Sequence, residues 1–265
     1  MHYGAMNFPV RPVVDEINTV ARLGFDYLEL AMDPPMAHYS ILSANSSAII
    51  RALKDNGLGL VCHLPTFLST ADLTESLRRA SVEEMRQSLR VAADLGAKKA
   101  VLHPSMAVGM GAYVLDTVKQ FAYEFLGIMV NAASQLDMTI CLENMMPRNM
   151  LGVEPDDFAE LFRALPTLKL TLDTGHANIG APEGDRLQEL IRQFGHRLGH
   201  LHFSDNRGYR DDHLPVGKGS VNFNRLLQGI KATGYNDTLT LEVFTDDQRM
   251  LINSRKRIKE LLSES

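Results

Sequence analysis

The sequence contains few cysteines and no long apolar run. Cys62 and Cys141 are the two thiols among 265 residues, too few for a disulfide framework, which fits a reducing compartment. No apolar segment approaches the ~20 residues that a membrane-spanning helix needs. The first residues also lack a basic segment followed by an apolar one, the pattern of a secretory signal. We therefore expect a soluble cytoplasmic protein with no membrane partner.

An excess of positive charge is absent as well. The formal net charge is −5 at pH 7, which gives no support for broad binding to nucleic acids or membrane surfaces. The chain also lacks Gly-x-Gly-x-x-Gly after its first apolar strand, the pattern of dinucleotide binding in doubly wound sheets. No linker or low-complexity tract divides it. With 45% hydrophobic residues it can bury a large core, and we expect one domain over residues 1–265.

Short β-like segments alternate with longer helical ones along the whole chain. The clearest helix covers 75–95, where Val82, Met85, Leu89 and Ala92 recur at steps of three or four residues. Strict alternation predicts a parallel sheet, and eight strand–helix units predict closure into a single (β/α)8 TIM barrel. The expected strands cover 3–8, 25–30, 59–64, 100–104, 139–143, 169–173, 199–203 and 238–243, and the expected helices cover 13–23, 43–56, 75–95, 112–135, 155–164, 184–195, 222–233 and 246–262.

Polar side chains stand where these strands end. The segment 170–176, Leu-Thr-Leu-Asp-Thr-Gly-His, is an apolar strand that finishes in a carboxylate and presents a histidine three residues later. In a TIM barrel the carboxyl ends of all strands meet at the catalytic face. Carboxylate and imidazole groups together suit zinc, manganese and cobalt. The residues at or just after the predicted strand ends are His63, His103, Glu143, Asp173, His176, His202, Asp211, His213 and Glu242.

Each of these residues also has a structural interpretation when taken singly. A histidine at a strand end can simply be hydrogen-bonded within the barrel, and a carboxylate can cap a helix or pair with an arginine. Taken together, however, Glu143, Asp173 and Glu242 at one barrel mouth would repel one another strongly unless a cation neutralised them. The sequence therefore predicts a divalent-metal site.

Three residues near this set are expected to be structural. His200 shares a strand face with the histidine two residues later and should lie one layer deeper, buried and hydrogen-bonded. Cys62 points to the opposite face from the neighbouring histidine and should pack between strand and helix. Cys141 should face the barrel interior as a small apolar filler.

The order of these motifs resembles a known superfamily. Leu-Glu-Asn at 142–144, Asp-Thr-Gly-His at 173–176 and Asp-x-His-Leu-Pro-x-Gly-x-Gly at 211–219 are similar to the xylose isomerase-like TIM-barrel superfamily. It covers sugar-phosphate isomerases and epimerases together with abasic-site nucleases of the endonuclease IV type. The resemblance extends over nearly the whole chain.

This resemblance implies two alternative metal sites, and the chain has the residue types for both. In ketose epimerases one ion is held at the positions of Glu143, Asp173, His202 and Glu242. In endonuclease IV three zinc ions are held by those residues and by the positions of His63, His103, His176, Asp211 and His213. One to three divalent ions are therefore implied, with zinc, manganese, cobalt or magnesium as the candidates.

The isomerase hypothesis assigns catalysis to three residues. A divalent ion would act as a Lewis acid on an open-chain sugar or sugar phosphate and stabilise an enediolate. Glu143 and Glu242 would remove and return the proton on opposite faces, and His176 would orient or protonate the substrate oxygen. The glycine-rich segment 217–220 either offers backbone N–H groups to a phosphate or is a plain connection.

The nuclease hypothesis is the alternative. It requires residues that grip and open DNA, and the nuclease family uses an arginine after the second strand and a tyrosine after the third. Here the segment 32–39 has no arginine and 66–68 offers Phe67 without a tyrosine. Because phosphate contacts dominate DNA affinity, Arg148 and the basic–aromatic cluster at 207–210 are thin support. We rank the nuclease second and a non-catalytic metal-binding or sugar-acid-binding barrel third, and a homodimer is possible.

Overall fold

A closed parallel barrel forms the centre of the molecule. The computed structural model describes residues 1–181 and 183–264, and within them the strands pair in sequence order, with the last pairing back to the first. This confirms the predicted (β/α)8 TIM barrel, while the prediction of one domain over 1–265 stays a prediction. The strands are β1 (His2–Met6), β2 (Tyr27–Ala31), β3 (Gly59–His63), β4 (Lys99–Leu102), β5 (Thr139–Glu143), β6 (Lys169–Asp173), β7 (Leu198–Phe203) and β8 (Thr238–Leu241).

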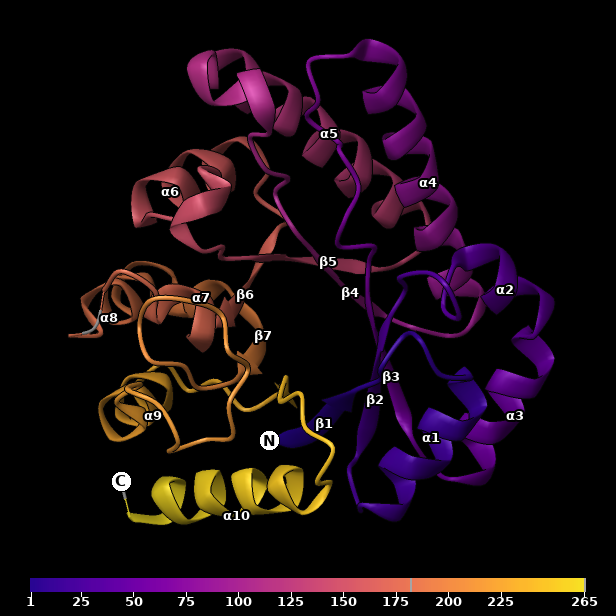
Figure 1. Ribbon diagram of the computed structural model, residues 1–265, viewed down its shortest axis with the longest axis vertical. Helices are drawn as coiled ribbons and strands as arrows, with labels where there is room; N and C mark the ends of the chain where they lie inside the picture. Colours follow the sequence, from indigo (N-terminus) through magenta and orange to yellow (C-terminus); the bar gives the residue numbers. More distant parts are fainter. Residues whose placement is uncertain (182, 265) are drawn as a thin grey trace.

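Helices encircle these strands, as Figure 1 shows. The last helix, α10 (Arg249–Glu264), closes the ring. It packs beside α9 (Phe223–Ala232), and its Arg255 donates to the Leu23 carbonyl 3.0 Å away, just after α1 (Val13–Arg22). None of the described helices combines the length and the apolar character needed to cross a bilayer. The helices are α1 (Val13–Arg22), α2 (Tyr39–Ala44), α3 (Ser46–Asp55), α4 (Glu75–Asp94), α5 (Leu115–Gln135), α6 (Pro155–Ala164), α7 (Thr174–Asn178), α8 (Asp185–Phe194), α9 (Phe223–Ala232) and α10 (Arg249–Glu264), with short 3-10 turns η1 (Gly109–Tyr113), η2 (Pro147–Asn149) and η3 (Gly195–Arg197).

Two helical segments differ from the sequence expectation. The helix expected over 43–56 is divided, because Asn45 ends α2 and its side chain donates to the Ile41 carbonyl (2.8 Å) before α3 begins. Directly after Asp173 the chain forms the one-turn helix α7, which lies outside the expected helical ranges and whose five residues are all buried. The Asp173 carboxylate caps it by accepting from His176 N at 2.6 Å.

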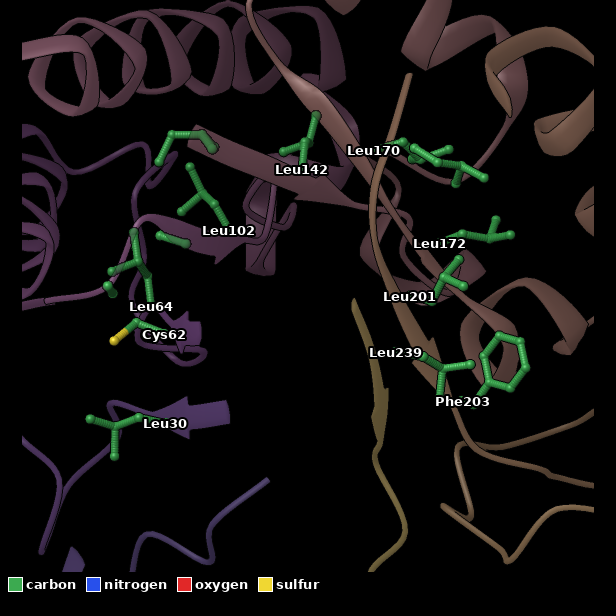
Figure 2. Close-up of a cluster of buried hydrophobic side chains, with 14 of the residues drawn as sticks. Leu30, Cys62, Leu64, Leu102, Leu142, Leu170, Leu172, Leu201, Phe203 and Leu239 are labelled. Atoms are coloured by element: carbon green, nitrogen blue, oxygen red, sulfur yellow. The ribbon is translucent and has the colours of Figure 1, made fainter. Parts of the chain in front are cut away.

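The apolar core lies between the strands and the helices. Side chains alternate along each strand, so the leucines of β6 point outward while Thr171 and Asp173 point inward. Cys62 is fully buried in this outer layer, as predicted. Figure 2 shows the labelled members of the layer around the barrel: Leu30, Cys62, Leu64, Leu102, Leu142, Leu170, Leu172, Leu201, Phe203 and Leu239.

The interior of the barrel contains both apolar and hydrogen-bonded polar side chains, unlike the apolar layer outside it. Below the mouth, Tyr27, Val61 and Val101 form a small buried apolar cluster. The Tyr27 hydroxyl lies 2.7 Å from Thr240 Oγ1, so the phenol is satisfied by a hydrogen bond across the barrel. Gly4 on β1 makes room for the Tyr27 ring, since a Cβ at that position would lie 2.3 Å from two ring carbons.

This close approach gives a stability prediction. Replacing Gly4 with Ala should lower the free energy of unfolding by about 1–3 kcal/mol, because the Tyr27 ring cannot move without leaving its hydrogen bond. Urea unfolding followed by circular dichroism measures the change. The matched control is Gly127→Ala in α5, where a Cβ would meet nothing within 4 Å and the helix should gain about 0.5–1 kcal/mol. Equal effects of the two substitutions would show that Gly4 is not required for packing.

Candidate metal centre

Four side chains converge at the barrel mouth from four strands. Glu143 and Asp173 end β5 and β6, His202 lies in β7, and Glu242 directly follows β8. Their ligand atoms all lie within 4.8 Å of one another. His202 Nδ1 is 3.3 Å from Glu143 Oε1, 3.4 Å from Glu242 Oε2 and 3.7 Å from Asp173 Oδ2. The convergence predicted from the strand ends is therefore present.

This cluster is buried and is contacted by imidazoles, but by no lysine or arginine in the described part of the chain. Glu143 and Asp173 are each 1% exposed and Glu242 is 8% exposed. Within residues 1–181 and 183–264, no lysine or arginine forms an ion pair with them. Asp173 Oδ2 and Glu242 Oε2 are buried without a hydrogen-bond partner in the described part of the chain. Buried carboxylate oxygens in this state are costly, and a divalent cation is the group that this donor set fits.

Two further histidines approach Glu143 from neighbouring strands. His63 at the end of β3 places Nε2 3.2 Å from Glu143 Oε2, and His103, one residue beyond β4, places Nε2 3.0 Å from the same oxygen. The other ring nitrogen of His63, Nδ1, lies 2.9 Å from the Leu64 carbonyl and donates to it. In the neutral ring this leaves the Nε2 lone pair facing the cluster, the orientation of a metal ligand.

A third group adjoins the cluster, because His176 Nδ1 lies 3.2 Å from Glu143 Oε1. His176 and His213 both face Asp211, with Nε2 to Oδ2 distances of 3.4 and 2.8 Å. Each ring is fixed through Nδ1, which lies 3.0 Å from the Asn144 carbonyl in His176 and 3.1 Å from the Glu242 carbonyl in His213. All nine residues predicted from the sequence are thus brought to one end of the barrel.

These groups strongly perturb one another in the metal-free protein. Burial, with the neighbouring Glu242 and Glu143, raises the pKa of Asp173 to about 8. Burial alone would lower the pKa of His63, but the contact with Glu143 outweighs it and raises that pKa to about 9. Burial would likewise raise the pKa of Glu143, yet the surrounding imidazoles hold it well below its usual range. Metal binding must therefore displace protons from this site.

Second-layer residues fix these positions. Asn144 accepts from Asp173 N at 2.8 Å and donates to the Asp173 carbonyl at 3.0 Å, which locks the ends of β5 and β6 together. Asp205 forms an antiparallel bridge with Leu214, with N···O distances of 2.9 and 2.8 Å, and so holds the loop that carries Asp211 and His213.

The same Asp205 decides between the two interpretations of the glycine-rich segment 217–220. Its Oδ2 accepts from Gly217 N and Gly219 N at 3.0 and 2.8 Å, and its Oδ1 accepts from Val221 N at 3.1 Å. Ser220 N is bonded to the Asn206 carbonyl at 2.7 Å. Because these N–H groups are already occupied, the phosphate-cradle interpretation is wrong and the segment is a structural connection.

One residue of the site escaped the sequence analysis. Glu29, in the middle of β2, is fully buried and its two oxygens accept from His200 Nε2 (2.8 Å) and His202 Nε2 (2.9 Å). His200 lies one layer below the mouth, buried and hydrogen-bonded to Thr238 Oγ1 at 2.7 Å, as predicted. The signal in the sequence was an acidic residue on the inward face of an otherwise apolar strand. It was missed because Glu29 lies in the middle of β2, whereas the candidate residues were sought at strand ends.

A cavity of about 410 Å³ opens above the cluster. Among the nine predicted residues, His63, His103, His176, Asp211, His213 and Glu242 line it, whereas Glu143, Asp173 and His202 lie beneath. Arg148 and Phe67 also line it, while the described lining does not include the cluster at 207–210. The apolar part of the wall consists of Phe8, Phe67, Met106, Met145, Met146 and Phe244, among other residues.

Known proteins are similar to this chain in sequence and in fold. Residues 17–263 match the family described as Xylose isomerase-like TIM barrel. The chain is similar to the uncharacterized protein MJ1311 of Methanocaldococcus jannaschii, with 27% identity over 269 residues that cover 99% of this chain and 89% of that protein. It is also similar to the L-ribulose-5-phosphate 3-epimerase UlaE of Escherichia coli (strain K12 / DH10B), with 23% identity over 244 residues, 88% of this chain and 82% of UlaE.

Solved structures show the same fold. A D-tagatose 3-epimerase-like protein superimposes with a TM-score of 0.88 at 25% identity, covering 100% of this chain and 98% of that one. A D-psicose 3-epimerase crystallised in the presence of D-fructose gives a TM-score of 0.79 at 18% identity, covering 99% of each chain, which shows the shared fold. With nearly all of its length matched, the chain belongs to the xylose isomerase-like TIM-barrel family.

Proposed function

We propose that this protein is a divalent-metal-dependent isomerase or epimerase of a ketose or ketose phosphate. The observation that carries the proposal is the buried group of Glu143, Asp173, His202 and Glu242, with ligand atoms within 4.8 Å of one another, at the floor of a cavity of about 410 Å³. The similarity to proteins named as ketose or ketose-phosphate epimerases supports this choice of reaction. A cytoplasmic location fits the two buried free cysteines, and a homodimer stays a prediction.

These four side chains would hold the ion. When bound, zinc, manganese, cobalt or magnesium supplies Lewis acidity to the carbonyl and neighbouring hydroxyl of an open-chain sugar. His202 would bind through Nδ1, because its Nε2–H is committed to the ionised carboxylate of Glu29, which can only accept. Burial alone would raise the pKa of Glu29, but His202 and His200 outweigh it and lower that pKa well below its usual range.

Two carboxylates would carry the acid–base work. Glu242 lines the cavity and so reaches a substrate carbon directly. Burial would raise its pKa, but His213 and His202 outweigh this and keep the group ionised, as a proton acceptor must be. Glu143 would act on the opposite face from β5, beneath His63 and His103. His176 lines the cavity and would orient or protonate the substrate oxygen.

The second candidate function is an endonuclease IV-like phosphodiesterase at abasic sites. One observation favours it: His63 and His103 gather at Glu143, while His176 and His213 gather at Asp211, so the site offers places for further ions. The basic–aromatic cluster at 207–210 lies outside the described cavity lining, however. Arg148 is then the one arginine or lysine of that described lining that could contact a DNA phosphate. We therefore keep the nuclease second.

The reaction itself can be tested by solvent exchange. Manganese- or cobalt-loaded protein incubated with D-ribulose or D-ribulose 5-phosphate in deuterated water should introduce deuterium at the carbon next to the carbonyl, detected by NMR. Glu242→Gln should slow this exchange by ~10²–10⁴-fold, because it removes a proton acceptor. Glu124→Gln, an exposed change in α5, is the matched control and should leave the rate unaltered. Exchange that survives Glu242→Gln would remove Glu242 from catalysis.

Metal stoichiometry tests the ligand assignment and separates the two functions. Purified protein analysed by mass spectrometry should contain at least one divalent ion, and Asp173→Asn should weaken metal binding by at least about 10-fold. Asp55→Asn at the exposed end of α3 controls for the loss of one charge. Three zinc equivalents together with nicking of abasic-site DNA would establish the alternative. Metal content that is the same in Asp173→Asn and in the wild type would show that the ligand assignment is wrong.

The role of Glu29 can be tested separately from the ligands. Glu29→Gln keeps the shape but removes the charge that holds the His202 ring, so the dissociation constant for manganese should rise by roughly 10–100-fold. Calorimetric titration gives this value, and thermal unfolding checks that the variant is folded. Tyr27→Phe removes a hydroxyl at a similar depth without touching His202 and should change the constant by less than about twofold. Wild-type affinity in Glu29→Gln would reduce Glu29 to a packing residue.

A further inference from the structure

The cavity wall carries a single basic side chain. Among the described lining residues Arg148 is the one lysine or arginine, and its guanidinium makes no hydrogen bond or ion pair within residues 1–181 and 183–264. The lining also contains three carboxylates and four imidazoles: Asp33, Asp211, Glu242, His63, His103, His176 and His213. The contacts around Arg148, which is exposed, give its guanidinium no structural role.

The loop that presents Arg148 is tightly built. It follows β5 as the turn η2, in which Met150 N bonds to the Pro147 carbonyl at 3.2 Å with Met150 in the left-handed region (φ 61°). Met145 N bonds to the Gly152 carbonyl at 2.7 Å, and Ala107 N from the preceding β4 loop bonds to the Asn149 carbonyl at 3.1 Å. The backbone at residue 148 is therefore held in place rather than free to vary.

A second observation points to a ligand at the same place. Asn149 is 5% exposed, lines the cavity, and has its Oδ1 buried without a hydrogen-bond partner in the described part of the chain. Leaving such an atom unpaired is costly. The Thr66 hydroxyl in the same lining is already committed, because it donates to Asp33 Oδ2 at 3.0 Å. The wall of the cavity thus offers a guanidinium and an unpaired amide oxygen, whereas the floor combines carboxylates and imidazoles.

We propose that Arg148 forms a subsite for an oxyanion on the substrate, at the end of the sugar chain away from the reacting carbons, and that Asn149 Oδ1 accepts a hydrogen bond from a substrate hydroxyl beside it. A guanidinium offers a planar pair of N–H donors that matches phosphate or carboxylate oxygens. The identification of the substrate as a ketose rests on the proposed function, but the oxyanion subsite does not. The substrate class becomes ketose phosphates or keto-acids rather than neutral sugars.

Direct binding tests the subsite without turnover. Calorimetric titration of the metal-loaded protein with inorganic phosphate and with acetate should show binding of at least one of them, weakened ~10-fold or more in Arg148→Met. Arg148→Lys keeps the charge but loses the planar pair of N–H donors, so its affinity for the anion should lie between those of the wild type and Arg148→Met. Arg163→Met, an exposed change at the end of α6 outside the cavity lining, controls for net charge. Absence of binding, or equal binding in wild type and Arg148→Met, overturns the proposal, because the anion would then rest on the metal alone.

Turnover identifies which oxyanion is used. Two ratios of kcat/KM are compared: D-ribulose 5-phosphate to D-ribulose, and D-fructuronate to D-fructose. In the wild type, the ratio for the preferred anion should exceed one. Arg148→Met should lower that ratio ~10- to 100-fold while leaving the neutral sugar within about twofold. Equal ratios in both proteins overturn the subsite. If no ketose reacts, the proposed function fails, and the phosphate and acetate titrations still decide the subsite.

Discussion

Repulsion between buried carboxylates is the constraint on which this structure depends. Two unit charges about 4 Å apart interact by about 4 kcal/mol at an effective dielectric constant of ~20. Glu143, Asp173 and Glu242 make three such pairs within the 4.8 Å group. Their full ionisation would therefore cost an amount comparable with the ~5–15 kcal/mol by which domains are stable. Some positive charge must reside in this group.

The metal-free protein meets this constraint with protons. Asp173 holds one up to a pKa of about 8, and His63 holds one up to a pKa of about 9. A divalent ion would replace this arrangement with two fixed positive charges and would also satisfy the orphaned oxygens of Asp173 and Glu242. In the proposed reaction the same ion would act on the substrate. One divalent ion would therefore both stabilise the barrel mouth and promote the chemistry.

The barrel makes this convergence predictable from the sequence to a large extent. Parallel strands that alternate with helices must bring their carboxyl ends to one rim, so residues at those ends meet however far apart they lie in the chain. Glu143 and Asp173 follow this rule directly, and His103 and Glu242 follow it within one residue of the strand end. Local patterns therefore sufficed to locate the candidate site.

Contacts that depend on depth or on loops could not be predicted in this way. Glu29 stands in the middle of β2, and only the packing of β2 against β7 through the barrel interior brings it to His202. The Asp205 carboxylate accepts from the backbone of Gly217 and Gly219 in the glycine-rich segment. The sequence of that segment does not show that Asp205 is its partner. Such pairings arise from three-dimensional closure, which the period of a strand or helix does not encode.

The loop after β5 joins the two halves of the proposed site. Glu143 ends the strand at the floor of the cavity, and Arg148 stands on its wall five residues later. Asn144 ties this segment to β6, and the hydrogen bond between Met145 and Gly152 closes it into a compact turn. The floor is constrained by the repulsion that its carboxylates must resolve, whereas the wall carries no such constraint. Under the proposed function, substrate preference could therefore change through this loop while the proposed metal-binding floor is retained, which is how one barrel supports many reactions.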